Sequence, residues 1–247
     1  MNLGLKGRTA IVCGASAGMG LAIAESLAAE GANVAMFARR RALLQREADR
    51  IGALAVVGDV TNPTHLKRLV DQTVKAFGGI DVLVNNSGGP PRGTAGELTD
   101  EGIESAVELL LLSVIRLTRL CLPHLEASAA GRIVNVTSLA VREPTAGLAL
   151  SNAVRPGVVG WAKTLAAELG PKGITVNSIA PGRIDTDRMK EVYPNGPTEA
   201  DVAAIPLRRF GSPAEAAAVV CFLASERASY VTGTLVPVDG GLGRGLV

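Results

Sequence analysis

The sequence has no marked excess of charge of either sign. Its 25 lysine and arginine residues stand against 23 aspartate and glutamate residues, so that the net charge is +2. The basic residues are scattered rather than clustered, which argues against a nucleic-acid-binding surface or an anionic-membrane anchor. We therefore expect a small-molecule substrate as the partner, with no nucleic acid and no membrane.

Cysteine is also scarce. The three cysteines are Cys13, Cys121 and Cys221, and no two of them form a Cys-x-x-Cys pair. This spacing argues against a disulfide framework and against a zinc site. We expect no metal and a reducing cytoplasm as the location.

Long hydrophobic runs are missing as well. The most apolar helical stretch, 107–115, contains Ser113 and is followed by Arg116 and Arg119, so it is too short and too charged to span a bilayer. Residues 1–7 lead directly into a strand pattern, and we expect no signal peptide. We find no linker-like run and no internal repeat, and 247 residues suit one large α/β domain.

Short β-branched runs alternate with longer helical patterns along the chain. Strands are predicted at 9–12, 33–37, 54–57, 82–84, 132–136, 174–179 and 235–238. Helices are predicted at 20–29, 41–50, 63–77, 100–127, 152–169 and 213–224. Strands separated by helices indicate a parallel sheet covered on both faces. The fold prediction is a single Rossmann-type, doubly wound α/β domain over residues 1–247.

One segment breaks this rhythm after the sixth strand. Residues 183–209 contain Pro194, Gly196, Pro197 and Pro206 and form the longest irregular stretch. We interpret it as a lid over the substrate, with a purely structural packing role as the alternative.

The turn after the first strand is rich in glycine. Residues 13–20 include Gly14, Gly18 and Gly20, and they open the first helix. Backbone N–H groups and the positive end of a helix at such a turn bind a diphosphate. The pattern at this position predicts a dinucleotide site, and the alternative is a tight turn without a ligand.

The end of the second strand lacks the acid that NAD sites usually carry. The chain reads Ala38-Arg39-Arg40-Arg41 there. A carboxylate would repel a 2′-phosphate, whereas the guanidinium of Arg39 pairs with it, so NADP(H) is favoured over NAD(H). The alternative is that three consecutive arginines form a solvated helix start.

Several further motifs resemble the short-chain dehydrogenase/reductase family along the whole chain. They are the Gly-x3-Gly-x-Gly turn, Asp59-Val60, Asn85-Asn86-Ser87-Gly88, Pro181-Gly182 with Thr186, and Asp239-Gly240-Gly241. The resemblance is greatest to the group that includes 3-oxoacyl-acyl-carrier-protein reductases and related alcohol dehydrogenases. It implies that Asp59 and Val60 flank the adenine, that Asn86 and Gly88 line the cofactor and that Thr186 contacts the nicotinamide amide. It also implies a homo-oligomer, a tetramer or a dimer.

The turn, the arginines and the resemblance together define the cofactor-binding candidates. They are Gly14, Ser16, Ala17, Gly18, Met19, Gly20, Arg39, Arg40, Asp59, Val60, Asn86, Ser87, Gly88, Arg155, Pro181, Gly182, Ile184 and Thr186.

The catalytic positions depart from the family pattern. Family members use a Ser for the carbonyl oxygen, a Tyr as general acid, a Lys four residues later and an Asn that holds a relay water. Ser138 matches the serine, whereas Ser151, Arg155 and Leu110 fall at the Tyr, Lys and Asn positions. The catalytic candidates are therefore Ser138, Ser151 and Arg155.

These replacements change the acid–base chemistry. A phenol is tuned towards neutral pKa, while an alkyl hydroxyl is not, and arginine stabilises charge without exchanging a proton. Ordered water between Ser151, Ser138 and Arg155 is one hypothesis for the proton source. The structural alternatives are that Arg155 only holds ribose hydroxyls, that Ser151 is a helix N-cap, and that Ser138 is a loop hydroxyl bonded to backbone.

Four other side chains are weighed as substitutes that reach the substrate or as ordinary surface and capping residues: Arg142, Glu143, Asn152 and Tyr193. Two functions follow. One is an NADP(H)-dependent oxidoreductase acting on a hydroxy or oxo compound. The other is a non-catalytic NADP(H)-binding subunit that supports an active paralogue. The preserved nucleotide features favour the oxidoreductase.

Overall fold

Seven parallel strands form one sheet in the order β3-β2-β1-β4-β5-β6-β7. The computed structural model describes residues 2–193 and 195–245. The strands are β1 (Thr9–Cys13), β2 (Asn33–Ala38), β3 (Leu54–Val57), β4 (Val82–Asn85), β5 (Arg132–Val136), β6 (Thr175–Pro181) and β7 (Leu235–Val238). All seven lie where the sequence predicts them, which confirms the doubly wound α/β fold.

The six predicted helices are present, with one interruption, and two further short helices lie in the segment 183–209 that the sequence predicts to be irregular. They are α1 (Gly18–Ala29), α2 (Arg41–Ile51), α3 (Pro63–Phe77), α4 (Asp100–Val107), α5 (Ser113–Ala127), α6 (Ala149–Leu169), α7 (Asp187–Val192), α8 (Glu199–Ala203) and α9 (Pro213–Ala224). The predicted helix 100–127 is divided by a π-helix, η2 (Glu108–Leu112). Short 3-10 turns are η1 (Ala95–Glu97), η3 (Leu139–Val141), η4 (Gly170–Lys172) and η5 (Glu226–Ala228).

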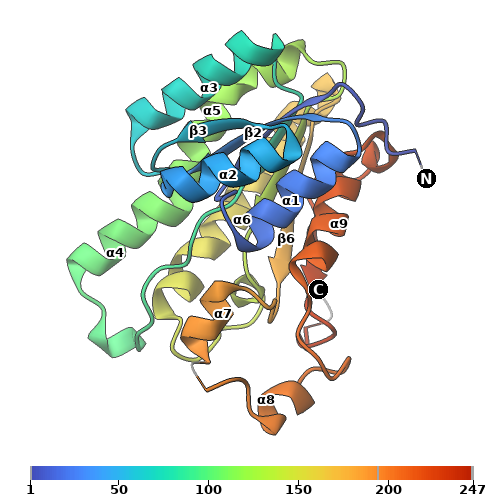
Figure 1. Cartoon of the computed structure of the whole chain (residues 1–247). Coiled ribbons are helices and arrows are strands. Elements are labelled where there is room, and N and C mark those ends of the chain that lie inside the picture. Colours follow the sequence, from blue (N-terminus) through green and yellow to red (C-terminus); the bar gives the residue numbers. More distant parts are fainter. Residues whose placement is uncertain (1, 194, 246–247) are drawn as a thin grey trace.

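Two helical layers cover the two faces of the sheet. Along β1, Ala10 and Val12 pack with apolar side chains of α1, α2 and α9 on one face. Ile11 and Cys13 point to the other face and pack with side chains of α3, α5 and α6. Figure 1 shows α1 beside α9 on the near face. The buried strands are apolar on both faces, as expected of a parallel sheet between helices.

The strand order places a crevice at the centre of the sheet. β1 pairs with β2 on one side and with β4 on the other, so the chain connections leave β1 and β4 in opposite directions. In open parallel sheets, ligands bind outside the carboxyl ends of the strands at this point. The helices α7 and α8 lie at the same end of the molecule in Figure 1, within the segment 183–209.

No helix in the described parts of the chain combines the length and the apolar character needed to cross a bilayer. Within residues 2–193 and 195–245 there is also no group of three or more His, Cys, Asp or Glu side chains that could hold a metal ion.

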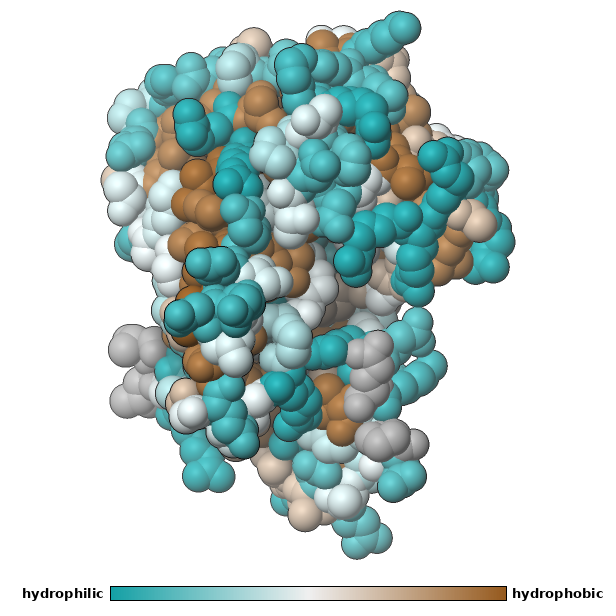
Figure 2. Space-filling view, turned by 90° about the vertical axis from the view of Figure 1, so that its left-hand side faces the viewer, coloured by the Kyte–Doolittle hydropathy of each residue, from teal (hydrophilic) through white to brown (hydrophobic). Residues whose placement is uncertain are grey.

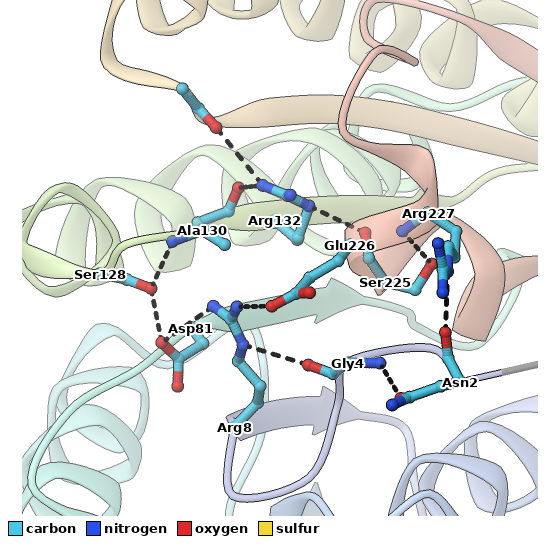
Figure 3. A network of polar contacts seen from close by, with 12 residues as sticks. Asn2, Gly4, Arg8, Asp81, Ser128, Ala130, Arg132, Ser225, Glu226 and Arg227 are labelled. Atoms are coloured by element: carbon cyan, nitrogen blue, oxygen red, sulfur yellow. Dashed lines mark hydrogen bonds and ion pairs between the residues drawn. The ribbon is translucent and has the colours of Figure 1, made fainter.

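A polar network lies at the amino ends of the strands, on the opposite side of the sheet from the crevice (Figure 3). The buried Arg132, at the start of β5, donates from Nε to the Ser225 carbonyl at 3.3 Å and from Nη1 to the Gly131 carbonyl at 2.9 Å. Arg8 pairs with Glu226 at 2.7 Å and with Asp81 at 3.8 Å. This network joins the N-terminal segment to the end of α9 and to the connection before β5. It lies far from the crevice at the carboxyl ends of the strands.

We expect the substitution Arg132→Met to lower the free energy of unfolding by about 2–4 kcal/mol, because it leaves buried carbonyls without a donor. Arg227→Met, in the same network, removes an exposed side chain with one hydrogen bond to the Asn2 carbonyl and serves as the matched control. Urea denaturation of both variants measures the difference. Equal free energies of unfolding for the two variants would contradict the proposed contribution of the Arg132 hydrogen bonds to stability.

Candidate functional site

The glycine-rich turn lies at the carboxyl end of β1, directly opposite the end of β4. Gly14 and Gly18 have positive φ angles of 62° and 57°, which favour glycine. A Cβ on Gly20 would overlap the carbonyl oxygen of Gly14. A Cβ on Gly14 would lie 2.6 Å from Asn86 Nδ2. The turn therefore brings backbone groups closer together than any side chain would permit.

Asn86 fixes the distance between the two strand ends. Its Nδ2 donates to the carbonyl oxygen of Cys13, the last residue of β1, at 3.1 Å. Asn86 directly follows β4, so this bond closes the floor of the crevice. The structure thus brings Gly14 and Gly20 close to Asn86, although β2, α2, β3, α3 and β4 lie between them in the sequence.

The N-terminus of α1 has no internal partner for its first N–H groups. Ala17 is the N-cap residue, no side chain caps the helix, and the first turn contains no acidic residue. Four N–H groups at a helix start lack intrahelical acceptors, and the helix dipole adds positive potential there. A diphosphate satisfies these groups, so the turn fits a dinucleotide.

Two arginines, Arg39 and Arg40, directly follow the end of β2. Arg40 Nη2 donates to the hydroxyl of the buried Ser16 at 3.4 Å. The largely exposed Arg39 approaches Asp59, with Nη1 3.8 Å from Oδ2. Burial raises the pKa of Asp59, but hydrogen bonds from Thr61 and the charge of Arg39 outweigh it, so the pKa lies below its usual value. Asp59 is therefore ionised and lies within ion-pair distance of the exposed Arg39.

The remaining cofactor candidates lie around the same crevice. Thr186, the N-cap residue of α7, approaches the turn, since its Cγ2 is 3.3 Å from where a Gly18 Cβ would lie. Gly182 packs against Asp239, where a Cβ would come within 2.7 Å of the aspartate Cβ. Val60, Asn86, Ser87 and Arg155 line one common cavity. The segment 183–209 therefore meets the glycine turn through Thr186.

Ser138 follows β5 and caps the short turn η3. Its Oγ accepts a hydrogen bond from the backbone N–H of Ala140 at 3.2 Å. This bond agrees with the alternative drawn from the sequence, in which Ser138 is a loop hydroxyl bonded to the backbone. The residue is half-buried, and the remaining lone pair and the hydroxyl proton are free for a ligand.

Ser151 is not a helix N-cap, contrary to the structural alternative weighed from the sequence. The helix α6 begins at Ala149 with Leu148 as its N-cap, so Ser151 lies inside the first turn. Its side chain is buried, and the described part of the chain offers its hydroxyl no hydrogen-bond partner.

Arg155 lies one helical turn further along α6 and is deeply buried. Its Nη1 donates to the carbonyl oxygens of Val136 and Thr137, each at 3.3 Å. Burial lowers the pKa of the guanidinium to about 10, so the group is still charged at neutral pH. The side chain is thus anchored to the end of β5, immediately before Ser138.

Leu110 lies in the π-helix η2 and faces inward. It is buried, and it lines the cavity that Arg155 also lines. π-helical turns within α-helices are rare and often occur at functional sites. The backbone irregularity is therefore present at this position, although the side chain there has no polar atom.

The four substitutes weighed from the sequence have other partners. Arg142 donates to the carbonyl of Gly245 at 2.8 Å, and Glu143 accepts from the backbone N–H of Gly245 at 2.7 Å. The Asn152 amide bonds both backbone groups of Thr145, at 3.0 and 3.1 Å. Tyr193 donates to Asp201 at 3.3 Å. The first two hold the C-terminal segment against η3, a contact that the sequence reasoning missed.

Comparison with known proteins places this geometry among reductases. A family model described as enoyl-(acyl carrier protein) reductase matches residues 14–243. The 3-oxoacyl-[acyl-carrier-protein] reductase FabG of Vibrio cholerae is 37% identical over 242 residues, which is 97% of this chain and 99% of that protein.

Two solved structures are similar over nearly the whole chain. L-sorbose reductase from Gluconobacter frateurii, complexed with NADPH and L-sorbose, has a TM-score of 0.92 and 33% identity, with complete coverage (100%) of both chains. An NADPH-bound short-chain oxidoreductase from Pseudomonas aeruginosa PAO1, described as containing an atypical catalytic center, has a TM-score of 0.91 and 34% identity. It covers 96% of this chain and 97% of its own.

The close packing at the glycine turn yields a direct test. We expect Gly20→Ala to lower the free energy of unfolding by about 1–3 kcal/mol and to weaken dinucleotide binding at least about tenfold, because the turn must open to admit the methyl group. Gly160→Ala is the matched control, since a Cβ there meets nothing within 4 Å. Calorimetric titration with NADPH and urea denaturation measure both effects. Unchanged affinity in Gly20→Ala would contradict the assignment of the turn.

Proposed function

Because the chain belongs to the short-chain dehydrogenase/reductase family, we propose that it is an NADP(H)-dependent oxidoreductase that acts on a hydroxy or oxo compound of low molecular weight. The observation that carries this proposal is the uncapped N-terminus of α1 behind the glycine turn, with arginines and no acid at the end of β2. Bound NADPH would supply the hydride for reduction of a carbonyl.

The cofactor is held by groups from four strand ends. Backbone N–H groups of the turn, from Ala17 to Gly20, receive the diphosphate. Asp59 and Val60 flank the adenine, while Asn86, Ser87 and Gly88 line the central part of the cofactor. Pro181, Gly182, Ile184 and Thr186 lie on the nicotinamide side. Gly14, Ser16 and Met19 complete the turn.

The 2′-phosphate is bound by Arg39 and Arg40. Arg39 is held near the site by Asp59, and Arg40 by Ser16. Planar guanidinium groups pair with phosphate oxygens through charge-assisted hydrogen bonds. This pairing favours NADP(H) over NAD(H).

The substrate oxygen is oriented by Ser138. Ser151, whose hydroxyl has no partner in the described part of the chain, lies on the neighbouring helix and donates a second hydrogen bond. Arg155 holds the hydroxyls of the nicotinamide ribose and supplies fixed positive charge beneath the site. An alkyl hydroxyl is a poor general acid, so water that enters between the two serines and Arg155 delivers the proton.

The assembly proposed for the protein is a homo-oligomer, a dimer or a tetramer, in the cytoplasm. Ile103 of α4 is an exposed large apolar residue, and partly buried leucines of η2 adjoin it in sequence. Figure 2 shows apolar surface running between hydrophilic residues on this side of the molecule. Light scattering coupled to size exclusion measures the mass, and a monomer would contradict this proposal.

The role of Arg39 is tested by cofactor discrimination. We expect Arg39→Ala to weaken NADPH binding about 10- to 100-fold, because a charge-assisted bond to phosphate is lost, and to leave NADH binding within about twofold. The neighbouring exposed Arg41→Ala is the control. Equal losses for both cofactors, measured by calorimetry, would show that Arg39 does not read the phosphate.

The proton source is tested by the pH dependence of turnover with a panel of ketones and aldehydes. Ser138 and Ser151 do not ionise, so we expect kcat/KM to be nearly constant between about pH 6 and 9. The pKa of Arg155 is lowered to about 10, so its charge is full below that value and kcat/KM falls as pH rises through it.

The triple variant Leu110→Asn, Ser151→Tyr and Arg155→Lys adds ionisable groups and is expected to introduce a pH dependence within that range. If the wild-type protein binds NADPH but has no turnover, while the triple variant gains it, the oxidoreductase assignment fails and a cofactor-binding subunit replaces it.

A further inference from the structure

The cavity lined by Asn86, Ser87 and Arg155 lies between the ends of β4 and β5 and the π-helix η2. It has about 20 Å³ of space, enough for one water-sized particle. Asn86 and Ser87 line its crevice side, and Leu110 and Ser113 line its helix side. Asn135 and Arg155 also face it. Elements of the central switch point thus line this partly open cavity.

Two buried donors at this cavity have no acceptor. They are Nε of Arg155 and Nδ2 of Asn135, and neither atom has a hydrogen-bond partner in the structure. Arg155 donates to the carbonyl of Val136, the residue next to Asn135 on β5. Both residues line the same cavity. Buried donors are almost always paired with protein groups or ordered water, and the described part of the chain offers these two no acceptor.

The orientation of the Asn135 amide follows from its neighbours. Asn85 lies directly across from Asn135 in the strand pairing, and its Nδ2 donates to Asn135 Oδ1 at 2.9 Å. The same Asn85 nitrogen donates to Thr118 Oγ1 at 3.1 Å. Because the Asn135 oxygen is engaged in this way, its NH₂ group must point elsewhere.

The charge of Arg155 is not balanced within the described part of the chain. Its bonds go to two neutral carbonyl oxygens, and no described aspartate or glutamate lies within 4.0 Å or among the cavity-lining residues. Buried charges in proteins are normally paired with an opposite charge, because an isolated buried ion is strongly disfavoured. A buried cation with a free donor, lining the same cavity as a second free donor, suits an anion.

We propose that this cavity binds one small monovalent anion of the halide class, held between Arg155 Nε and Asn135 Nδ2. Both groups only donate, and the Ser113 hydroxyl is engaged in donating to the Leu109 carbonyl at 2.6 Å. The space in the cavity suits a single small ion. The anion neutralises the guanidinium and so stabilises the folded protein. Arg155 and this cavity also belong to the proposed cofactor site, so the ion is tested without cofactor.

The first experiment locates the ion. Crystals of the wild-type protein soaked in sodium bromide are expected to show a bromide anomalous peak within hydrogen-bonding distance of Arg155 Nε and Asn135 Nδ2. A map with density for water there, and no anomalous signal, would overturn the proposal. Because no cofactor is present, that outcome would leave the proposed oxidoreductase activity unaffected.

The second experiment measures the coupling to stability. Sodium bromide is compared with sodium gluconate at equal ionic strength, and a saturable rise of the melting temperature by about 3–5 °C is expected at ten times the dissociation constant. Asn135→Asp supplies an internal counter-charge, so we expect it to weaken bromide binding at least about tenfold and to abolish this rise.

The matched control is Asn33→Asp, which makes the same change of charge at an exposed residue on β2. It is expected to retain the bromide response. A bromide response of equal size in Asn135→Asp and the wild-type protein would overturn the site assignment. If Asn135→Asp fails to fold, the anomalous map of the wild-type protein decides the question alone.

Discussion

The close approach of backbone to backbone at the end of β1 is the constraint on which the site depends. Gly20 must lack a Cβ to lie against the carbonyl of Gly14, and Asn86 reaches across to Cys13 from the end of β4. Together they hold the uncapped start of α1 over the central crevice of the sheet. We propose that Thr186, Asp59 and Arg155 face the dinucleotide that this arrangement would receive.

Arg155 gives the site its second distinguishing property, a buried positive charge with no acidic partner in the described part of the chain. It is fastened to carbonyls at the end of β5 rather than to an acid. Ser151 and Leu110, on the elements beside it, provide neither a tunable proton nor a second polar anchor. In the reaction we propose, the site acts through orientation by hydroxyl groups and stabilisation by fixed charge, with solvent as the proton source.

Most of the fold was predictable from the sequence, because hydrophobic periodicity and the spacing of glycine and proline act locally. The seven strands, the glycine turn and the helix α3 with its Asn62 cap and Pro63 show this directly. The π-helix η2 was not predictable, since five residues of sequence Glu-Leu-Leu-Leu-Leu are equally compatible with an α-helix. The contact of Glu143 with the C-terminal segment joins residues about a hundred positions apart and has no local signal. The free amide of Asn135 had one available signal, an asparagine inside a buried strand.

A crystal structure of the protein grown with NADP⁺ tests the central claim most directly. The account predicts density for the diphosphate on the N–H groups at the start of α1, with the 2′-phosphate between Arg39 and Arg40 and the nicotinamide ribose beside Arg155. A dinucleotide bound elsewhere on the molecule, or well-ordered crystals without any bound dinucleotide at saturating concentration, would contradict it.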